Sequence, residues 1–264
     1  MPTLARINVT PVKSMALHHP ERARVGIAGI EGDRRFFLVD PSGALVTAAD
    51  APELLRIRPR YDASRERLAL TLPDGSSVAD AVDRLGPPLV TDLWGHPLAG
   101  RIVEGTLAEA IGSAVGRPLR LARCEPTRSA VDVHPVTLVS SASVARLGAD
   151  GGAEALDARR FRMTLELDGC APYEEDGWTG RVLRVGGARL LVGPQVPRCV
   201  VTTLNPDTGR KDFPTLTVIA RTRTRIEGGG GLPFGMYARV LDPGALRVGD
   251  PVEIDERASL PDLG

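Results

Sequence analysis

The sequence predicts a mostly β protein with a few helices (α+β), in which a small N-terminal β-barrel half precedes a second β-rich half. Short stretches of alternating apolar and polar residues recur along the 264 residues. The 29 Gly and 22 Pro are enough turn-forming residues to separate many short strands. Few segments have the three-and-four-residue spacing of apolar side chains that marks an amphipathic helix.

The first half consists mainly of predicted strands. The first is expected over residues 4–12, where apolar and polar residues alternate. Pro11 should end it and leave Lys13 and Ser14 in a loop. Further short strands, separated by Gly and Pro turns, are expected over residues 24–27, 35–40, 44–47, 57–61 and 67–72.

A helix and a strand close this half. Thr106 and Glu109 have the spacing of a capping box, and the apolar residues that follow repeat at helical intervals. The pattern predicts a helix over residues 106–115 and a strand over residues 119–123.

A polar, irregular stretch follows and continues to His134. Domain boundaries commonly fall in such segments, because few contacts cross them. We therefore expect one domain over residues 1–122 and a second over residues 123–264.

The second half mixes strands with short helices. Residues 182–185 and 188–192 flank a Gly-Gly pair, a two-residue link that permits a type I′ hairpin. Residues 217–225 fit a helix and a strand equally, and residues 228–231 predict a flexible glycine loop. A helix is expected over residues 141–147, and strands over residues 136–139, 162–167, 200–204, 236–241 and 252–254.

Charge and composition exclude a dedicated nucleic-acid binder. Lys plus Arg number 33 and Asp plus Glu number 33, so the formal net charge is zero. A nucleic-acid-binding domain carries a net basic charge or a basic face. With Phe 5, Tyr 3 and Trp 2, the chain also offers few stacking platforms for single strands.

The remaining composition predicts a cytoplasmic protein without a membrane partner. No apolar run approaches the length of a membrane-spanning helix, and the N-terminal residues do not resemble a secretory signal. The three cysteines, Cys124, Cys170 and Cys199, are odd in number and widely spaced. Such cysteines indicate a reducing compartment rather than a disulfide framework.

Cys199 is the most informative candidate for chemistry, since no common catalytic motif occurs in the chain. It follows Arg198 next to an expected strand, and a neighbouring cation favours the thiolate form that binds soft metals. The alternative is a small buried hydrophobic residue. Cys170 has acidic neighbours, which disfavour a thiolate, and the four histidines are expected to be ordinary surface residues.

Lys13 and Ser14 are candidates for binding an anion. An ammonium group and a hydroxyl group together in a loop suit a phosphate or another anionic oxygen. Arg35 and Arg162 have the same capacity, but the arginines are too numerous for composition to choose among them.

Five segments in order resemble successive blocks of one family. They are INVTPVKS, GIEGDRRFFLVDPSGALVTAAD, RRFRMTLELDGCAPYEEDGW, VPRCVVTTLNPDTG and LPFGMYARVLDPGALRVGDPVEI. Together they resemble MOSC-domain proteins, in which a MOSC N-terminal β-barrel domain precedes a MOSC β-barrel domain. The pattern is similar to that of the mitochondrial amidoxime-reducing components and of bacterial reductases that act on N-hydroxylated bases.

The resemblance implies a molybdenum cofactor, in which a pterin dithiolene holds molybdenum and one protein cysteine completes the sulfur ligation. Cys199 matches that cysteine, which makes it the implied metal ligand and catalytic residue. The residues that match cofactor-binding positions are Lys13, Ser14, Arg35, Arg162, Ser140 and Ser141. The chain departs from the family pattern at Met163-Thr164, where relatives have Pro-Asn, and at Met236, where they have Gln.

The resemblance also implies an oxidoreductase that removes oxygen from N-hydroxylated or N-oxide compounds at molybdenum. Its electrons would come from a separate donor, a ferredoxin, flavodoxin or flavin reductase, because three cysteines are too few for a four-cysteine iron–sulfur cluster. We expect a monomer. The alternative is a non-catalytic carrier of the cofactor or of sulfur that uses Cys199, since MOSC domains also occur in cofactor sulfurases.

Overall fold

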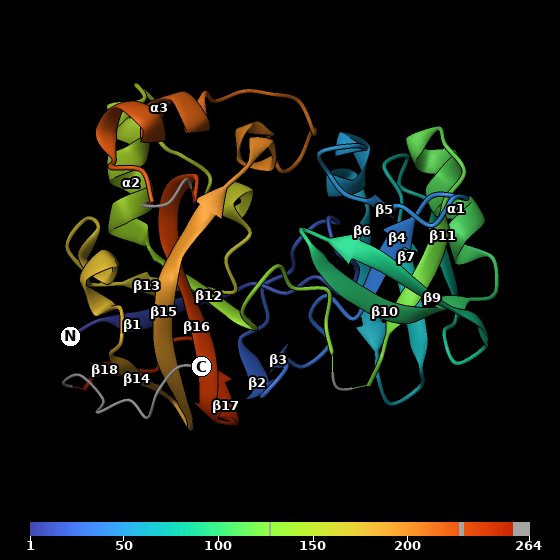
Figure 1. Ribbon diagram of the computed structural model, residues 1–264, viewed down its shortest axis with the longest axis horizontal. Helices are drawn as coiled ribbons and strands as arrows, with labels where there is room; N and C mark the ends of the chain where they lie inside the picture. The colour runs from blue at the N-terminus through green and yellow to red at the C-terminus, as the bar shows by residue number, and fades with distance from the viewer. Residues whose placement is uncertain (127, 227–229, 256–264) are drawn as a thin grey trace.

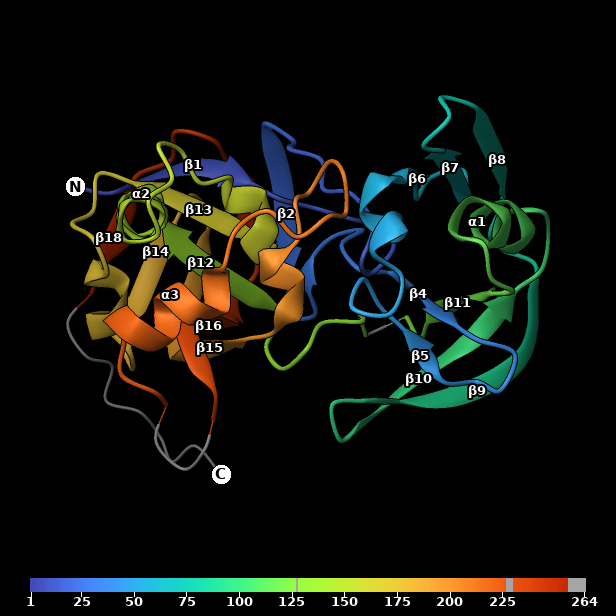
Figure 2. The same ribbon diagram turned by 90° about the horizontal axis from the view of Figure 1, so that it is seen from above.

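Two β bodies lie side by side in the computed structural model, which describes residues 1–126, 128–226 and 230–255 (Figure 1). The first body runs from β4 to β11 along the chain. The second body combines β1 to β3 with every element from β12 onward, so the chain enters it twice (Figures 1 and 2).

A seven-stranded sheet of order β1-β13-β12-β16-β15-β14-β18 forms the second body. The Leu4 N–H donates to the Asp250 carbonyl and the Val252 N–H donates to the Pro2 carbonyl, both at 2.8 Å. These bonds join the two edges of the sheet and nearly close it into a barrel. Its strands are β1 (Thr3–Ile7), β12 (Val136–Ser140), β13 (Leu165–Asp168), β14 (Val182–Val185), β15 (Ala188–Arg198), β16 (Leu232–Asp242) and β18 (Val252–Ile254).

A small sheet of order β17-β2-β3 packs on the same core. It consists of β2 (Arg22–Gly26), β3 (Gly29–Ile30) and β17 (Gly244–Arg247). β1, β2 and β3 therefore fold with strands from the second half of the chain, whereas Val12 and Met15, which lie between β1 and β2, pack in the core of the first body. The boundary between residues 122 and 123 stays a prediction, but the segment before it does not fold with the first body alone.

The first body contains a five-stranded sheet of order β5-β4-β11-β10-β9 and a three-stranded sheet of order β6-β7-β8. A helix, α1 (Leu107–Val115), and a 3-10 helix, η1 (Pro52–Arg56), pack on their shared apolar core. The strands are β4 (Phe36–Val39), β5 (Leu45–Val46), β6 (Arg58–Asp62), β7 (Arg67–Thr71), β8 (Ser77–Ala81), β9 (Leu85–Leu93), β10 (His96–Val103) and β11 (Arg120–Cys124).

Two helices cover one end of the second body's barrel, α2 (Ser141–Asp150) and α3 (Thr215–Thr222) (Figure 1). Their apolar faces bury Leu147, Val218 and Ile219 completely, and these pack with Phe161 and Phe234. Three 3-10 helices complete the body: η2 (Ala158–Phe161), η3 (Glu174–Trp178) and η4 (Val200–Thr203). The mostly β fold class with a few helices is confirmed.

The structure corrects the predictions for two segments next to candidate site residues. The predicted strand over residues 200–204 is wrong, because η4 occupies Val200–Thr203. The predicted strand over residues 162–167 starts later, at Leu165, because Arg162 adopts a left-handed conformation with φ of 54° at the end of η2. Both differences lie where the chain turns toward the space between the bodies.

Three smaller predictions also change. The capping box does not form, since Thr106 makes no cap hydrogen bond and its hydroxyl donates to Asp80 instead. The hairpin between β14 and β15 is confirmed, but φ is positive only at the first glycine of its turn, Gly186, whereas a type I′ turn needs both. The first strand ends at Ile7 instead of Val12, and a β-bulge between Leu4 and Arg6 brings Leu4 and Ile7 both into the core.

In the ambiguous segment over residues 217–225, residues 217–222 belong to α3, which ends at Thr222. Of the predicted glycine loop over residues 228–231, Gly228 and Gly229 lie outside the described residues. No helix that the structure describes has the length and apolar character to cross a membrane.

Candidate active site

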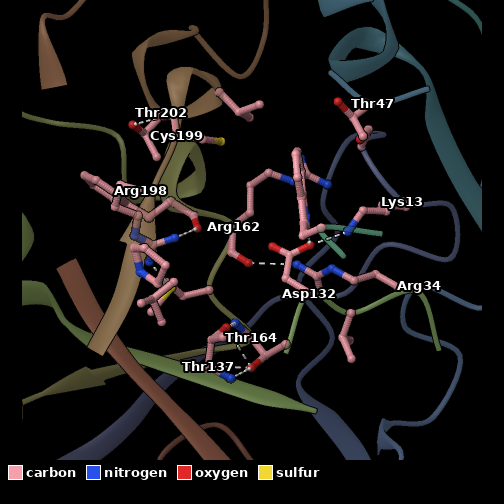
Figure 3. A pocket seen from close by; sticks show the side chains of 18 of the residues that line it. Lys13, Arg34, Thr47, Asp132, Thr137, Arg162, Thr164, Arg198, Cys199 and Thr202 are labelled. Atoms are coloured by element: carbon pink, nitrogen blue, oxygen red, sulfur yellow. Dashed lines mark hydrogen bonds and ion pairs between the residues drawn. The ribbon is translucent and has the colours of Figure 1, made fainter. Parts of the chain in front are cut away.

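A cavity of about 380 Å³ lies between the two bodies and is lined by both. Lys13, Arg34 and Thr47 stand on one side of it, and Cys199 and Thr202 face them from the other (Figure 3). The site is thus assembled from segments nearly two hundred residues apart.

Cys199 occupies the point where β15 ends and η4 begins. It is an exposed residue, and its sulfur points into the cavity (Figure 3). Thr202 holds the local backbone, because its N–H and its hydroxyl both donate to the Cys199 carbonyl, at 3.2 and 2.9 Å. The thiol is therefore presented by a tight turn at a strand end.

The other two thiols do not line this cavity. Cys124 is 2% exposed, and burial raises the pKa of its thiol to about 12. Burial, followed by the charge of Glu174, raises the pKa of Cys170 to about 12 as well. Both pKa values disfavour the thiolate form, and neither thiol reaches the cavity.

Arg162 projects between the two sides of the cavity (Figure 3). Its guanidinium donates to the Met15 carbonyl at 2.7 Å, and its own carbonyl accepts from Arg34 at 2.8 Å. Burial, and then the nearby charge of Arg34, lower the pKa of Arg162 to about 9. No carboxylate pairs with this guanidinium in the described part of the chain.

Arg198 is a second partly buried cation without a carboxylate partner among the described residues. Its guanidinium donates to the Phe234 carbonyl at 2.8 Å and to the Phe161 carbonyl at 3.1 Å, and lies over the Phe161 ring. Burial lowers the pKa of Arg198 to about 10. The cation is thus fixed next to Cys199 by carbonyl groups and a ring face, which carry no full negative charge.

Lys13 is nearly buried and already has partners. Its ammonium donates to the Ala130 carbonyl at 2.9 Å and to Asp132 Oδ1 at 2.6 Å. The same Asp132 oxygen accepts from Trp94 Nε1 at 3.1 Å. Burial raises the pKa of the Asp132 carboxyl group, but the ammonium of Lys13, the charge of Arg34 and the Trp94 hydrogen bond together lower this pKa below its usual value. Lys13 therefore ties the segment between the two bodies to the cavity wall.

The charges that line the cavity do not balance. The lining cations are Lys13, Arg34, Arg160, Arg162 and Arg198, and the one carboxylate among the described lining residues is Asp132. Carboxylates outside the lining compensate two further cations, since Asp33 pairs with Arg34 and Asp212 pairs with Arg160. Arg162 and Arg198 remain, and Arg160 Nε is buried without a hydrogen-bond partner in the described residues. An isolated buried charge is costly, so this cavity favours an anionic occupant.

Comparison with known proteins agrees with this geometry. The family model for the MOSC N-terminal beta barrel domain matches residues 1–103, and the model for the MOSC domain matches residues 125–253. The chain belongs to the MOSC-domain proteins. Its cavity therefore lies between the parts of the chain that these two models match.

Named relatives of this MOSC protein fall into two groups. It is 27% identical to mitochondrial amidoxime-reducing component 1 of Homo sapiens, over 95% of this chain and 82% of the relative. It is 29% identical to the molybdenum cofactor sulfurase of Drosophila grimshawi, over 96% of this chain but 34% of the relative. The chain thus spans about a third of that sulfurase. The YuaD protein from Bacillus subtilis superposes with a TM-score of 0.49 at 12% identity over 96% of both chains, too remote a likeness to inform the site.

Four of the site residues predicted for the MOSC cofactor lie together in the cavity: Lys13, Ser14, Arg162 and Cys199. Arg35 is not at the cavity, because its guanidinium donates to the carbonyls of Glu125 and Arg128. Its neighbour Arg34 takes the cavity position instead. Arg34 lies in the turn before β4 with φ of 47°, where its ion pair with Asp33 and its hydrogen bond to the Arg162 carbonyl hold it at the site.

Ser140 and Ser141 also lie away from the cavity of the MOSC protein. Ser140 is the N-cap of α2, where its side chain accepts from the Ser143 N–H at 3.1 Å. Ser141 donates to Asp168. Both hydroxyls have local structural roles at the start of a helix.

Sequence reasoning missed several lining residues of the MOSC protein's cavity. Asp132 and His134 fall in the irregular stretch taken as a linker, and segments that join two bodies commonly contribute to sites between them. His134 was expected at the surface, but it lines the cavity and packs edge-on against Tyr237 with ring centroids 5.4 Å apart. Arg198 was visible in the sequence as a neighbour of Cys199, although nothing there indicated that its guanidinium is partly buried against carbonyl groups and a ring.

Proposed function

We propose that this chain binds a molybdenum cofactor in the cavity and uses it to reduce N-hydroxylated or N-oxide compounds by removing oxygen. Amidoximes, hydroxylamines and N-hydroxylated bases are the substrate class. The single observation that carries the proposal is that one accessible thiol, Cys199, lines the same cavity as two partly buried arginines, Arg162 and Arg198, that have no carboxylate partner in the described residues. The names of the amidoxime-reducing relatives support the reaction class.

The residues present fit such a cofactor. A molybdopterin-type group is anionic through its phosphate and its dithiolene sulfurs, and the cavity holds uncompensated positive charge at Arg162 and Arg198. Soft metals bind thiolate sulfur, and Cys199 supplies the one cavity thiol among the described residues. When bound, the cofactor supplies a metal that exchanges two electrons and takes oxygen from the substrate.

The chain's own residues would position the cofactor and compensate its negative charge. Cys199 would ligate the metal, while Arg162 and Arg198 would neutralise the anionic group, with Ser14 at the same wall. Lys13 is a weaker phosphate contact than the resemblance implies, since two of its three N–H donors already bind Ala130 and Asp132. Its role in this proposal is to hold the linking segment in place.

The overall reduction consumes two electrons and two protons and releases water. The electrons would come from a separate donor protein, a ferredoxin, flavodoxin or flavin reductase. The monomeric state and the cytoplasmic location stay predictions.

The test is reduction of benzamidoxime by the purified protein with a chemical electron donor. We expect turnover by the wild type, loss of turnover in Cys199→Ser, and retention in Cys170→Ser, which removes a half-buried thiol away from the cavity. Equal activity of the two variants would contradict the role of Cys199.

A carrier of the cofactor or of sulfur is the second candidate, favoured by the exposure of Cys199 and by the sulfurase relative. A purified wild type that contains molybdenum but reduces no N-hydroxylated compound would support this carrier function over the reductase.

A further inference from the structure

Trp94 has a backbone conformation that its residue type rarely adopts. It occupies, with Gly95, the two-residue loop of the β9–β10 hairpin, whose last paired residues are Leu93 and His96. The φ angles of Trp94 and Gly95 are 56° and 87°, and a type I′ turn needs positive values at both positions. Asn and Gly are the residues that such turns prefer, whereas a bulky side chain at positive φ is an outlier. The turn itself therefore does not explain a tryptophan.

Neighbouring side chains hold Trp94 in place. The Asp92 carboxylate accepts from the Gly95 N–H at 3.1 and 3.2 Å, which fixes the turn. The indole Nε1 donates to Asp132 Oδ1 at 3.1 Å. The hairpin extends from its own sheet toward the second body (Figures 1 and 2), so the indole lines the cavity while 59% of the residue stays exposed.

Trp94 and Val200 form an exposed apolar part of the cavity lining. Val200 directly follows Cys199 and is 36% exposed. Of the exposed large hydrophobic side chains that the structure describes, these two line the cavity. The cationic interior accounts for an anionic cofactor, but it does not account for exposed apolar side chains next to the thiol.

We propose that Trp94 is a specificity-determining residue, whose exposed indole face binds the planar apolar substituent of an N-hydroxylated substrate while the N–O group points toward Cys199. This inference rests on the proposed function. Strain at a position held by surrounding contacts is typical of ligand-binding segments. Offset or edge-on packing of two aromatic rings adds binding energy beyond the area that it buries.

The first test compares two substrates of the same reactive group, benzamidoxime with a phenyl ring and acetamidoxime with a methyl group, on the loaded enzyme. Trp94→Asn is the main variant, because Asn-Gly suits a type I′ turn and keeps the hairpin folded. We expect its KM for benzamidoxime to rise about fivefold, with its kcat and its KM for acetamidoxime within about twofold of wild type. Trp94→Phe keeps a ring and should stay within about twofold for both substrates.

Val90→Ala is the matched control. Val90 lies on β9 and is 67% exposed, but it does not line the cavity. We expect wild-type KM values for both substrates in this variant. Equal changes of both KM values in Trp94→Asn, or no change in either, would overturn the proposed role of Trp94.

A second test does not depend on turnover. The chain has two tryptophans, and Trp178 is 4% exposed in the barrel core. Titration of the loaded protein with benzamidine, the product of benzamidoxime reduction, should change the tryptophan emission of the wild type, and acetamidine should change it less. Trp94→Phe should lose this change in emission, and an undiminished change in Trp94→Phe would contradict the proposed role of Trp94. If the wild type reduces neither substrate, the reductase function fails, while this titration still decides the role of Trp94.

Discussion

Lys13 shows how far a single residue can depart from its sequence-based interpretation. Lys13 is one of only two lysines, and in a predicted loop it was expected to bind a phosphate or another anionic oxygen. In the structure Lys13 is 7% exposed, and its ammonium donates hydrogen bonds to Ala130 and Asp132, more than a hundred residues away. No local pattern contains such a partner. The place of Cys199 in the cavity, in contrast, was predictable, because the segment around it, VPRCVVTTLNPDTG, resembles a block of the MOSC family.

Lys13→Met tests this structural role. The substitution keeps the apolar stem but leaves the half-exposed Asp132 carboxylate without its ammonium, so we expect the free energy of unfolding to fall by about 1–3 kcal/mol. In an Asp132→Asn background, Lys13→Met should lower the free energy of unfolding by clearly less, because no carboxylate then remains without its ammonium partner. Urea denaturation of the four proteins measures both costs. Identical costs in the two backgrounds would show that Lys13 acts independently of Asp132.

At the scale of elements, regular hairpins were predictable and irregular segments were not. The β14–β15 hairpin follows directly from two alternating runs around two glycines. After Cys199, the β-branched run Val-Val-Thr-Thr forms η4 instead of a strand, because Thr202 and Thr203 donate their hydroxyls to the carbonyls of Cys199 and Val200. Such local side-chain bonds compete with strand formation. β9 was missed because it contains adjacent prolines, which it tolerates as an edge strand.

Gly244 shows how closely β17 approaches the turn between β14 and β15. A Cβ atom at Gly244 would lie 2.1 Å from the Gly187 carbonyl oxygen, so the backbone would have to move. We expect Gly244→Ala to lower the free energy of unfolding by about 2–3 kcal/mol, because overpacking forces such shifts.

Gly177 is the matched control for this prediction. It has nothing within 4 Å of its added Cβ and no positive φ, and Gly177→Ala should be neutral or stabilising by up to about 1 kcal/mol. Thermal unfolding followed by circular dichroism compares the two variants. Equal melting temperatures would contradict the close approach of β17.

At the scale of the whole molecule, the net charge of zero conceals a local imbalance. The composition argues against a dedicated nucleic-acid binder, but it contains no information on where charges are buried. The fold brings segments from both ends of the chain into one body and leaves Arg162 and Arg198 at a cavity between the two bodies, without carboxylate partners in the described residues. Burial of this kind results from chain topology, which residue counts and periodicity do not encode. The family resemblance implies a molybdenum cofactor, and the two arginines without carboxylate partners give a physical reason for an anionic group in the cavity.

The central claim is that Cys199 binds molybdenum in this cavity, and elemental analysis tests it most directly. The wild type, Cys199→Ser and Cys170→Ser are purified from cells that make the molybdenum cofactor, and molybdenum is measured per protein chain. We predict about one molybdenum per chain in the wild type and in Cys170→Ser, and a loss of most of it in Cys199→Ser, because a thiolate ligand contributes directly to metal affinity. A wild type without molybdenum, or a Cys199→Ser variant that keeps its full content, would contradict the account.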